Sequence, residues 1–256
     1  MSARRLRSSV LAVALIVLAG CATLPPAPRQ PITAEARDVI KRLDERWREF
    51  SSLRTLADLS IRQGTSRQQA RGVLLVKAPG SVRFEALSPM GQPLLLATVH
   101  QGRLTAYDAT TNEGYVGPAT AEMTARFLHL PFEPDDLVGM LSGRPIPPAD
   151  IRSAQLLPPD EVGPSIEMHG TNNRRRIWFD PTTRAVKQFE LSGGRAEARV
   201  RYVPTPGGEI GGFDLTAGLN TVAASVRYQN PALGVPIDPD AFVLTIPKGA
   251  KTQEIR

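Results

Sequence analysis

Short segments in which apolar and polar residues alternate are the feature that most constrains the fold of this chain. Ala57, Leu59 and Ile61 alternate with polar neighbours, and the same period of two recurs over 53–117 and 153–246. This period places one class of side chain on each face of a β-strand. Glycine, proline and asparagine, which are typical of turns, separate the segments. The strands expected from this pattern are 53–62, 66–77, 81–88, 93–100, 103–108, 113–117, 153–157, 164–169, 174–179, 185–191, 196–203, 210–216, 221–229 and 242–246.

Helical segments interrupt this pattern in two places. Thr33 is a predicted N-cap, and the helix that follows it has an apolar face that includes Trp47 and Phe50. Two short helices, at 120–130 and 134–142, come after the sixth strand, and the prolines around them keep them short.

These elements predict a mainly β protein with some α, of the α+β class. A single curled antiparallel sheet of about 11 strands is expected, because a sheet of that width does not stay flat. We expect the amphipathic N-terminal helix and a helical lid insert, made of the two short helices, to cover the concave face. That arrangement leaves an apolar hollow between the sheet and the lid.

The first 20 residues have the pattern of a bacterial signal peptide. Basic residues precede an apolar stretch at 10–18, which is too short to span a bilayer. The run ends in Leu-Ala-Gly-Cys, a lipobox whose cysteine, Cys21, is the only one in the chain. We expect cleavage before Cys21 and acylation of that residue, which would anchor the protein to a membrane. The alternative is an ordinary signal peptide beside an incidental cysteine.

Residues 21–32 form a proline-rich tether that would join the lipid to a single domain at 33–256. Ala22 follows the predicted anchor, at the position where an aspartate retains many Gram-negative lipoproteins in the inner membrane. The absence of aspartate favours the outer membrane, with the domain facing the periplasm.

The formal net charge of +6 partly reflects arginines that removal of the signal peptide would take away. The densest remaining basic cluster is Arg174-Arg175-Arg176. A solvated strand start is the favoured interpretation of that cluster, and contact with anionic lipid headgroups is the alternative. No basic run with interleaved aromatic residues is present, so a nucleic-acid partner is not expected.

The sequence lacks the patterns that would indicate catalysis or metal binding. His100, His129 and His169 do not have the spacing of metal ligands. There is no G-x-S-x-G motif and no glycine-rich phosphate loop, and acylation of the only cysteine removes the thiol. The pair Asp135-Asp136 fits the electrostatics of a helix start. We therefore expect no catalytic residues, no metal site and no cofactor other than the covalent lipid on the cysteine.

Four segments resemble one protein superfamily. The stretch 83–92, Arg-Phe-Glu-Ala-Leu-Ser-Pro-Met-Gly-Gln, has a strand followed by a Pro-hydrophobic-Gly loop, and 102–108 resembles the next hairpin. The helices at 123–143 resemble a lid insert, and 238–249 resembles a closing strand. This order is similar to that of the LolA/LolB lipoprotein-carrier superfamily, and most of all to LolB, which is itself a lipoprotein. The segment 149–163 departs from LolB.

The resemblance implies a half-barrel sheet with a helical lid and a cavity for acyl chains. It assigns membrane insertion to the loop of Pro89, Met90 and Gly91, where LolB carries an exposed leucine. The alternative for Met90 is a methionine packed in the core beside a turn. The predicted cavity residues are Phe84, Leu94, Leu96, Met123, Phe127 and Leu141, with ordinary core packing as the alternative for each.

The function that the resemblance implies is that of a membrane-anchored, monomeric lipoprotein. It would bind acyl chains and help to receive or insert lipoproteins, or other lipids, at the outer membrane. Its partners would be membrane lipid, lipoprotein acyl chains and a periplasmic LolA-like carrier. The alternative is a non-catalytic scaffold or interaction lipoprotein of the cell envelope that uses the same fold without lipid cargo.

Overall fold

The computed structural model describes residues 32–128, 132–193, 197–218 and 221–255. The predicted signal peptide, Cys21 and the tether up to Pro31 lie outside these residues. None of the described helices has the length and apolar character needed to cross a membrane.

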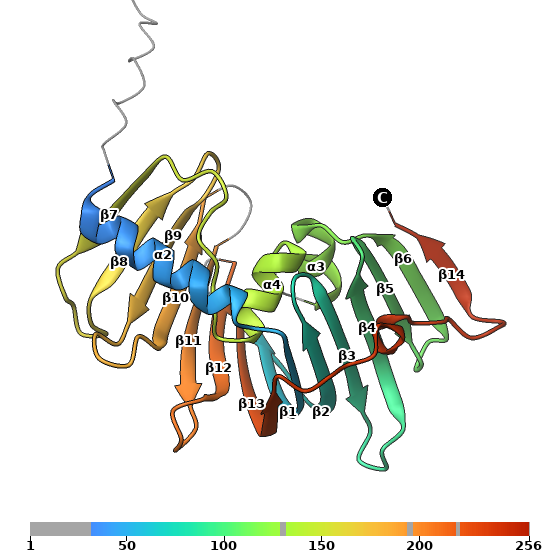
Figure 1. The fold of residues 1–256 in the computed structure, drawn as a ribbon. Helices are drawn as coiled ribbons and strands as arrows, with labels where there is room; N and C mark the ends of the chain where they lie inside the picture. The colour runs from blue at the N-terminus through green and yellow to red at the C-terminus, as the bar shows by residue number, and fades with distance from the viewer. Residues whose placement is uncertain (1–31, 129–131, 194–196, 219–220, 256) are drawn as a thin grey trace, which may run out of the picture. The chain divides into compact units, whose positions relative to one another are not determined.

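One sheet of 14 strands forms most of the described chain (Figure 1). Its strand order is β14-β6-β5-β4-β3-β2-β1-β13-β12-β11-β10-β9-β8-β7, and every neighbouring pair except β14–β6 is antiparallel. The strands are β1 (Ser52–Gln63), β2 (Ser66–Lys77), β3 (Ser81–Leu87), β4 (Pro93–His100), β5 (Arg103–Asp108), β6 (Glu113–Pro118), β7 (Ser153–Leu157), β8 (Ser165–His169), β9 (Arg174–Phe179), β10 (Val186–Ser192), β11 (Ala198–Pro204), β12 (Ile210–Ala217), β13 (Val222–Leu233) and β14 (Lys251–Glu254).

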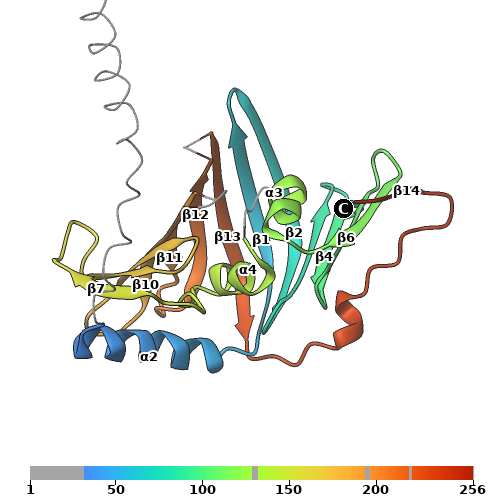
Figure 2. The same ribbon diagram turned by 90° about the horizontal axis from the view of Figure 1, so that it is seen from above.

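The sheet is curled, as expected, and helices cover its concave side (Figure 2). The helices are α2 (Ala34–Arg48), α3 (Ala121–Leu128) and α4 (Pro134–Leu141). The start of α2 at Thr33 is confirmed, because the Thr33 hydroxyl accepts a hydrogen bond from the backbone N–H of Ala36 at 3.2 Å. Ala36 and Leu43 bury the apolar face of α2. Trp47 and Phe50 stack at the end of that helix, with their ring centroids 6.2 Å apart.

The sheet is wider than predicted, because 14 strands join it, whereas a sheet of about 11 strands was expected from the predicted segments. The predicted strand at 242–246 is wrong, because Pro239–Phe242 forms a short 3-10 helix, η1, and no strand follows it directly. The closing strand is β14 instead, which pairs in parallel with β6 at the edge of the sheet.

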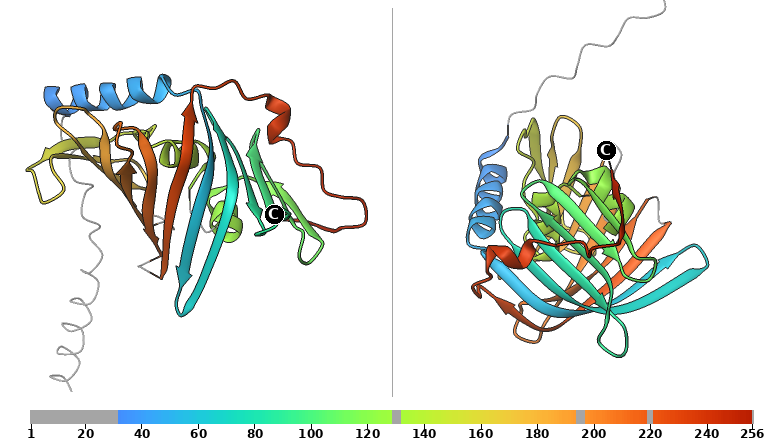
Figure 3. Two further views of the ribbon diagram at one scale, coloured as in Figure 1. Left: turned by 90° about the horizontal axis from the view of Figure 1, so that it is seen from below. Right: turned by 90° about the vertical axis from the view of Figure 1, so that its right-hand side faces the viewer.

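Contacts between distant segments explain this difference at the C-terminus. The Arg83 guanidinium donates to the carbonyl of Ala241 at 2.8 Å, and the Phe242 ring stacks on His100 with centroids 5.8 Å apart. Further along, Ile255 packs against Gly117, where any Cβ would collide with it. The segment between β13 and β14 therefore runs along the sheet without strand pairing (Figure 3). Side-chain contacts such as those of Arg83 and Phe242 hold it there.

Candidate functional site

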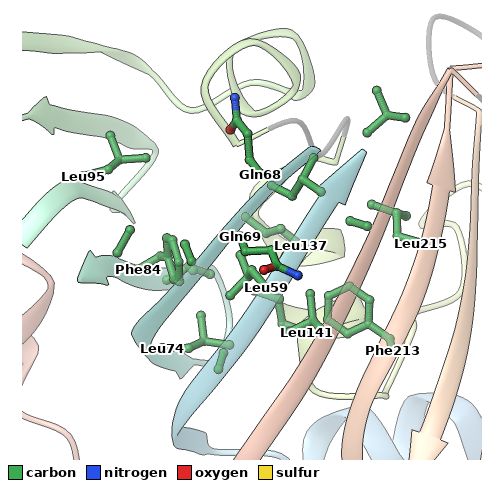
Figure 4. Close-up of a pocket in the computed structure, with 18 of the residues that line it drawn as sticks. Leu59, Gln68, Gln69, Leu74, Phe84, Leu95, Leu137, Leu141, Phe213 and Leu215 are labelled. Carbon is green, nitrogen blue, oxygen red and sulfur yellow. The ribbon is translucent and has the colours of Figure 1, made fainter. Parts of the chain in front are cut away.

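An apolar cavity of about 530 Å³ lies on the concave side of the sheet. Strands β1, β2, β3, β4, β12 and β13 form its walls, and α4 closes one end. Figure 4 shows Leu59 and Leu74 from neighbouring strands, and Leu137 and Leu141 from α4, around the same space. Its volume lies within the range of about 300–1,000 Å³ that is usual for small-ligand sites.

The alternation noticed in the sequence produces the apolar walls. Ala57, Leu59 and Ile61 of β1 face the cavity, and the polar residues between them face outward. All the described residues that line the cavity are apolar except Gln68 and Gln69. Because water in a cavity needs polar partners, this lining favours hydrocarbon over water.

The cavity opens at one end of the strands. At the α4 end, Ala57, Leu74 and Val226 are buried. At the other end, Gln68 and Gln69 are exposed. The opening is therefore bordered by the β1–β2 hairpin, the β3–β4 loop and the first residues of β13, which we call the rim and define as residues 60–70, 86–94 and 221–224.

Phe84 shapes one wall of the cavity through its contact with Gly72 on the neighbouring strand. A Cβ at Gly72 would overlap both the Phe84 ring and the carbonyl oxygen of Glu85. The absence of a side chain at Gly72 lets the ring pack directly against β2. The ring then remains half-buried and faces the cavity.

A buried ion pair holds the first turn of α4. The Asp136 carboxylate accepts hydrogen bonds from both terminal nitrogens of the Arg175 guanidinium, at 2.6 and 2.8 Å. Arg175 also donates to the carbonyl of Ile146 at 2.8 Å. Burial raises the pKa of the Asp136 carboxyl, and the charge and hydrogen bonds of Arg175 oppose that shift.

Two further contacts hold the last turn of α4 and the residues after it. The Tyr228 hydroxyl donates to the carbonyl of Leu141 at 2.7 Å, and burial raises the pKa of that phenol. Arg144 donates to the carbonyl of Arg46 at the end of α2 at 2.5 Å. Helix α4 is thus fastened at both ends, and the opening at the rim offers access to the cavity without movement of α4.

Solved structures of low sequence similarity share this arrangement of sheet and helices. A proposed outer membrane lipoprotein-sorting protein domain from Vibrio parahaemolyticus superposes with a TM-score of 0.55 at 9% identity, over 81% of this chain and 96% of that one. A DUF1329 family protein from Desulfovibrio piger gives 0.57 at 12% identity, over 82% and 96%. A LolA superfamily protein from Nitrosomonas europaea gives 0.55 at 12% identity, over 82% and 97%.

This chain has the LolA-like fold. The fold that the sequence resemblance implied is therefore confirmed. No family model and no curated protein sequence matches the chain. The likeness is one of structure alone, and the LolB-like role stays a proposal.

The LolA-like fold brings three of the six predicted cavity residues to the cavity wall, namely Phe84, Leu94 and Leu141. Met123 is buried in the core but is not part of the lining. Phe127 belongs to α3, and its side chain lies outside the described residues.

The prediction for Leu96 is wrong. Leu96 is in register with Glu85 and Tyr107, so its side chain is on the face of β4 that points away from the cavity. Leu95, which is in register with Ala86, faces the cavity instead, and a register shift between Ala86 and Leu87 falls at Leu94, which also lines the cavity. The run around Leu96 is apolar on both faces, and for this reason the sequence pattern could not distinguish them.

The loop predicted to enter membranes lies on the rim. Gly91 N–H donates to the carbonyl of Ser88 at 2.8 Å, which closes a turn, and Gly91 has a φ of 79° that favours glycine. Met90 stands at its tip with 86% of its surface exposed. The alternative of a core methionine is therefore excluded, while membrane insertion itself stays a prediction.

Sequence analysis missed most of the cavity lining. Leu74, Leu137, Phe213 and Val226 all face the cavity and were not singled out. Their positions follow the strand and helix periods, so the pattern marks them as inward-facing. It carries no signal that separates a packed core from a hollow one.

The interpretation of Arg174-Arg175-Arg176 as a solvated strand start is wrong for two of the three residues. Arg175 is buried against Asp136. Arg176 lies over the Trp178 ring, 4.1 Å from its centroid, and pairs with Asp160 at 2.7 Å. These arginines stabilise the fold, and the weaker suggestion that they contact lipid headgroups loses its basis.

A second cavity, of about 830 Å³, lies near the β2–β3 turn and η1. Its lining carries charged groups of both signs, among them Lys77, Glu133 and Asp135, so it is poorly suited to an acyl chain. Its Ser81 hydroxyl lies 2.8 Å from His100 Nδ1. No described carboxylate hydrogen-bonds to His100, so the orienting group of a hydrolytic triad is missing there.

Proposed function

We propose that this protein is a membrane-anchored envelope lipoprotein that binds acyl chains in the apolar cavity. The single observation that carries the proposal is the cavity of about 530 Å³ with no charged group in its described lining. Each methylene removed from water contributes about 0.8 kcal/mol, so such a cavity stabilises a lipid tail outside the bilayer.

The same geometry supports delivery to a membrane. Cargo enters and leaves through the rim, because α4 is fastened at both ends by Arg175 and Tyr228. Met90 stands on this rim, where an exposed apolar side chain would enter the bilayer first. The acyl chain then exchanges one apolar environment for another without crossing water.

The anchoring part of the proposal rests on the sequence. Acylated Cys21 and the tether at 21–32 would keep the domain close to one membrane, and Ala22 favours the outer membrane. A firmly anchored protein does not diffuse across the periplasm. The role is therefore that of a fixed acceptor, which receives lipoproteins or other lipids from a soluble LolA-like carrier.

Binding of a fluorescent fatty acid tests the cavity. We compare wild type with Leu59→Glu, which places a carboxylate in the cavity wall, and with the matched control Ser60→Glu on the outer face of the same strand. Leu59→Glu should weaken binding at least tenfold, and Ser60→Glu should leave it unchanged. Equal binding by both variants, with an unchanged circular dichroism spectrum, would contradict the proposal.

Depletion of the protein from cells tests the role in sorting. Lipoproteins should then accumulate in the inner membrane, as shown by density fractionation. Normal sorting after depletion, together with no fatty acid binding by wild type, would leave the scaffold function as the better explanation.

A further inference from the structure

Two arginines face each other at the tip of the β1–β2 hairpin. Arg62 and Arg67 are direct cross-strand partners, so their side chains lie on the same face of the hairpin. Both are exposed, and neither forms an ion pair with a described carboxylate. Like charges placed opposite each other repel, and an anion bound by both arginines would relieve that repulsion.

The rim offers no acidic group to neutralise this pair. Its segments, 60–70, 86–94 and 221–224, contain no aspartate or glutamate, and Arg62 and Arg67 are its only charged residues. The nearest acid along β1 is Asp58, which accepts from Arg71 at 2.6 Å and from Gln229 at 2.9 Å. The rim therefore presents a net positive charge beside an apolar opening.

The hairpin also projects beyond its neighbour. Strand β3 pairs with β2 only from Arg71 onward, so residues 66–70 extend past the end of β3. Figure 2 shows the β1–β2 hairpin projecting from the sheet. Met90 on the adjacent loop is 86% exposed, and Leu94 is 37% exposed. A flat surface brought against the opening would meet the two arginines and these apolar side chains together.

We propose that Arg62 and Arg67 bind the phosphate groups of anionic phospholipids and so orient the cavity opening on a bilayer. This inference rests on the proposed function, which brings the rim to a membrane. Guanidinium groups bind phosphate through paired charge-assisted hydrogen bonds. An anionic surface that also admits apolar side chains matches both the two arginines and the exposed apolar side chains of the rim.

Vesicle flotation tests the inference with the full chain carrying Cys21→Ser, which removes any acyl anchor. We compare vesicles of phosphatidylcholine with vesicles that also contain phosphatidylglycerol. The preference for phosphatidylglycerol should fall about thirtyfold in Arg62→Gln/Arg67→Gln, since each arginine near an anionic surface contributes a factor of about five. Added salt should abolish the preference of the parent chain.

Arg54→Gln/Arg103→Gln is the matched control. It removes the same charge from exposed arginines at the strand ends opposite the rim. The preference for phosphatidylglycerol should fall much less in this variant. Equal losses in the two double variants would overturn the inference, as would equal binding of the parent chain to both kinds of vesicle. In either case an acidic protein, rather than a bilayer, would be the better candidate for the partner of the charged rim.

Fatty acid binding separates this inference from the proposed function. Arg62→Gln/Arg67→Gln should bind the fluorescent fatty acid as wild type does, which also shows that it is folded. If wild type binds no fatty acid but floats with anionic vesicles through these arginines, the cavity proposal fails and the membrane contact stands. If fatty acid binds and the arginines have no effect on flotation, only the membrane contact fails.

Discussion

Arg175 on β9 and Asp136 in the first turn of α4 form a bidentate ion pair inside the protein. The side chains are only 8% and 11% exposed, and the two hydrogen bonds measure 2.6 and 2.8 Å. Through this pair the sheet holds the helix that carries Leu137 and Leu141 into the cavity. The geometry of the cavity thus depends on a polar contact outside it.

Loss of the Asp136 carboxylate should therefore be costly. We expect Asp136→Ala to lower the free energy of unfolding by about 3–5 kcal/mol, because it leaves a buried guanidinium without its counter-charge. Urea denaturation measures the change. Asp44→Ala, which removes the exposed partner of Arg48, serves as the control and should cost less than about 1 kcal/mol. Similar effects for both variants would contradict this role of the buried pair.

Replacement of Arg175, the other partner of this ion pair, should have an effect on stability that depends on pH. Arg175→Met leaves Asp136 buried, and since burial already raises the pKa of that carboxyl, the group can take up a proton. We expect the stability difference from wild type to shrink as the pH is lowered from 7 to about 5. Urea denaturation at the two pH values measures this, and a pH-independent difference would show that Asp136 stays charged without its partner.

Gly72 should be intolerant of even the smallest side chain. Gly72→Ala places a methyl group against the Phe84 ring and the Glu85 carbonyl, so the strands must shift. We expect a loss of about 1–3 kcal/mol in unfolding free energy and weaker fatty acid binding, as the ring moves into the cavity. Gly207→Ala, in a turn where the nearest atom is 3.8 Å away, is the control and should change neither quantity.

Met90 should affect transfer rather than folding. Because its side chain is 86% exposed, Met90→Glu should leave the unfolding free energy within about 0.5 kcal/mol of wild type. Passage of a fluorescent acyl cargo to vesicles should slow about tenfold, since a charge replaces a side chain that gains about 1.5–3 kcal/mol on burial. Gln92→Glu adds the same charge to the loop, and an equal slowing by that variant would show that charge alone is responsible.

Asp180 in the β9–β10 turn should make stability depend on acid pH. Backbone N–H groups of Thr183 and Thr182, at 2.8 and 2.9 Å, and the Lys187 ammonium lower the pKa of this carboxyl from 3.8 to about 2. The stabilisation it provides is complete above the unfolded pKa of 3.8 and is lost as the pH falls through 2. The difference between wild type and Asp180→Ala in urea denaturation should therefore be constant at neutral pH and disappear below pH 2. A difference that persists in strong acid would contradict this assignment.

The local pattern of apolar and polar residues was sufficient to predict most of the strands and helices. The period of two along β1 and β2 reports which face of each strand is buried, and the N-cap at Thr33 marks the start of α2. These features depend on neighbours a few residues away, so they can be identified without knowledge of the rest of the chain. The curl of the sheet followed from its width.

Contacts between distant residues determined the remainder. Arg175 and Asp136 are 39 positions apart, and β14 pairs with the distant strand β6, where Ile255 packs against Gly117. Neither partner carries a local sign of the other. The side of β4 that faces the cavity depends on its pairing with β3, which places Leu96 beside Glu85 on the outer face.

The cavity depends partly on local sequence and partly on contacts that form only in the folded chain. The chain's alternation of side chains determines that Leu59 and Phe213 face inward, because each strand segregates its own residues. Whether the inward space is filled or empty depends on how far α4 stands from the sheet. That distance is set by the Arg175–Asp136 pair and by Tyr228, contacts that arise only when the whole chain has folded.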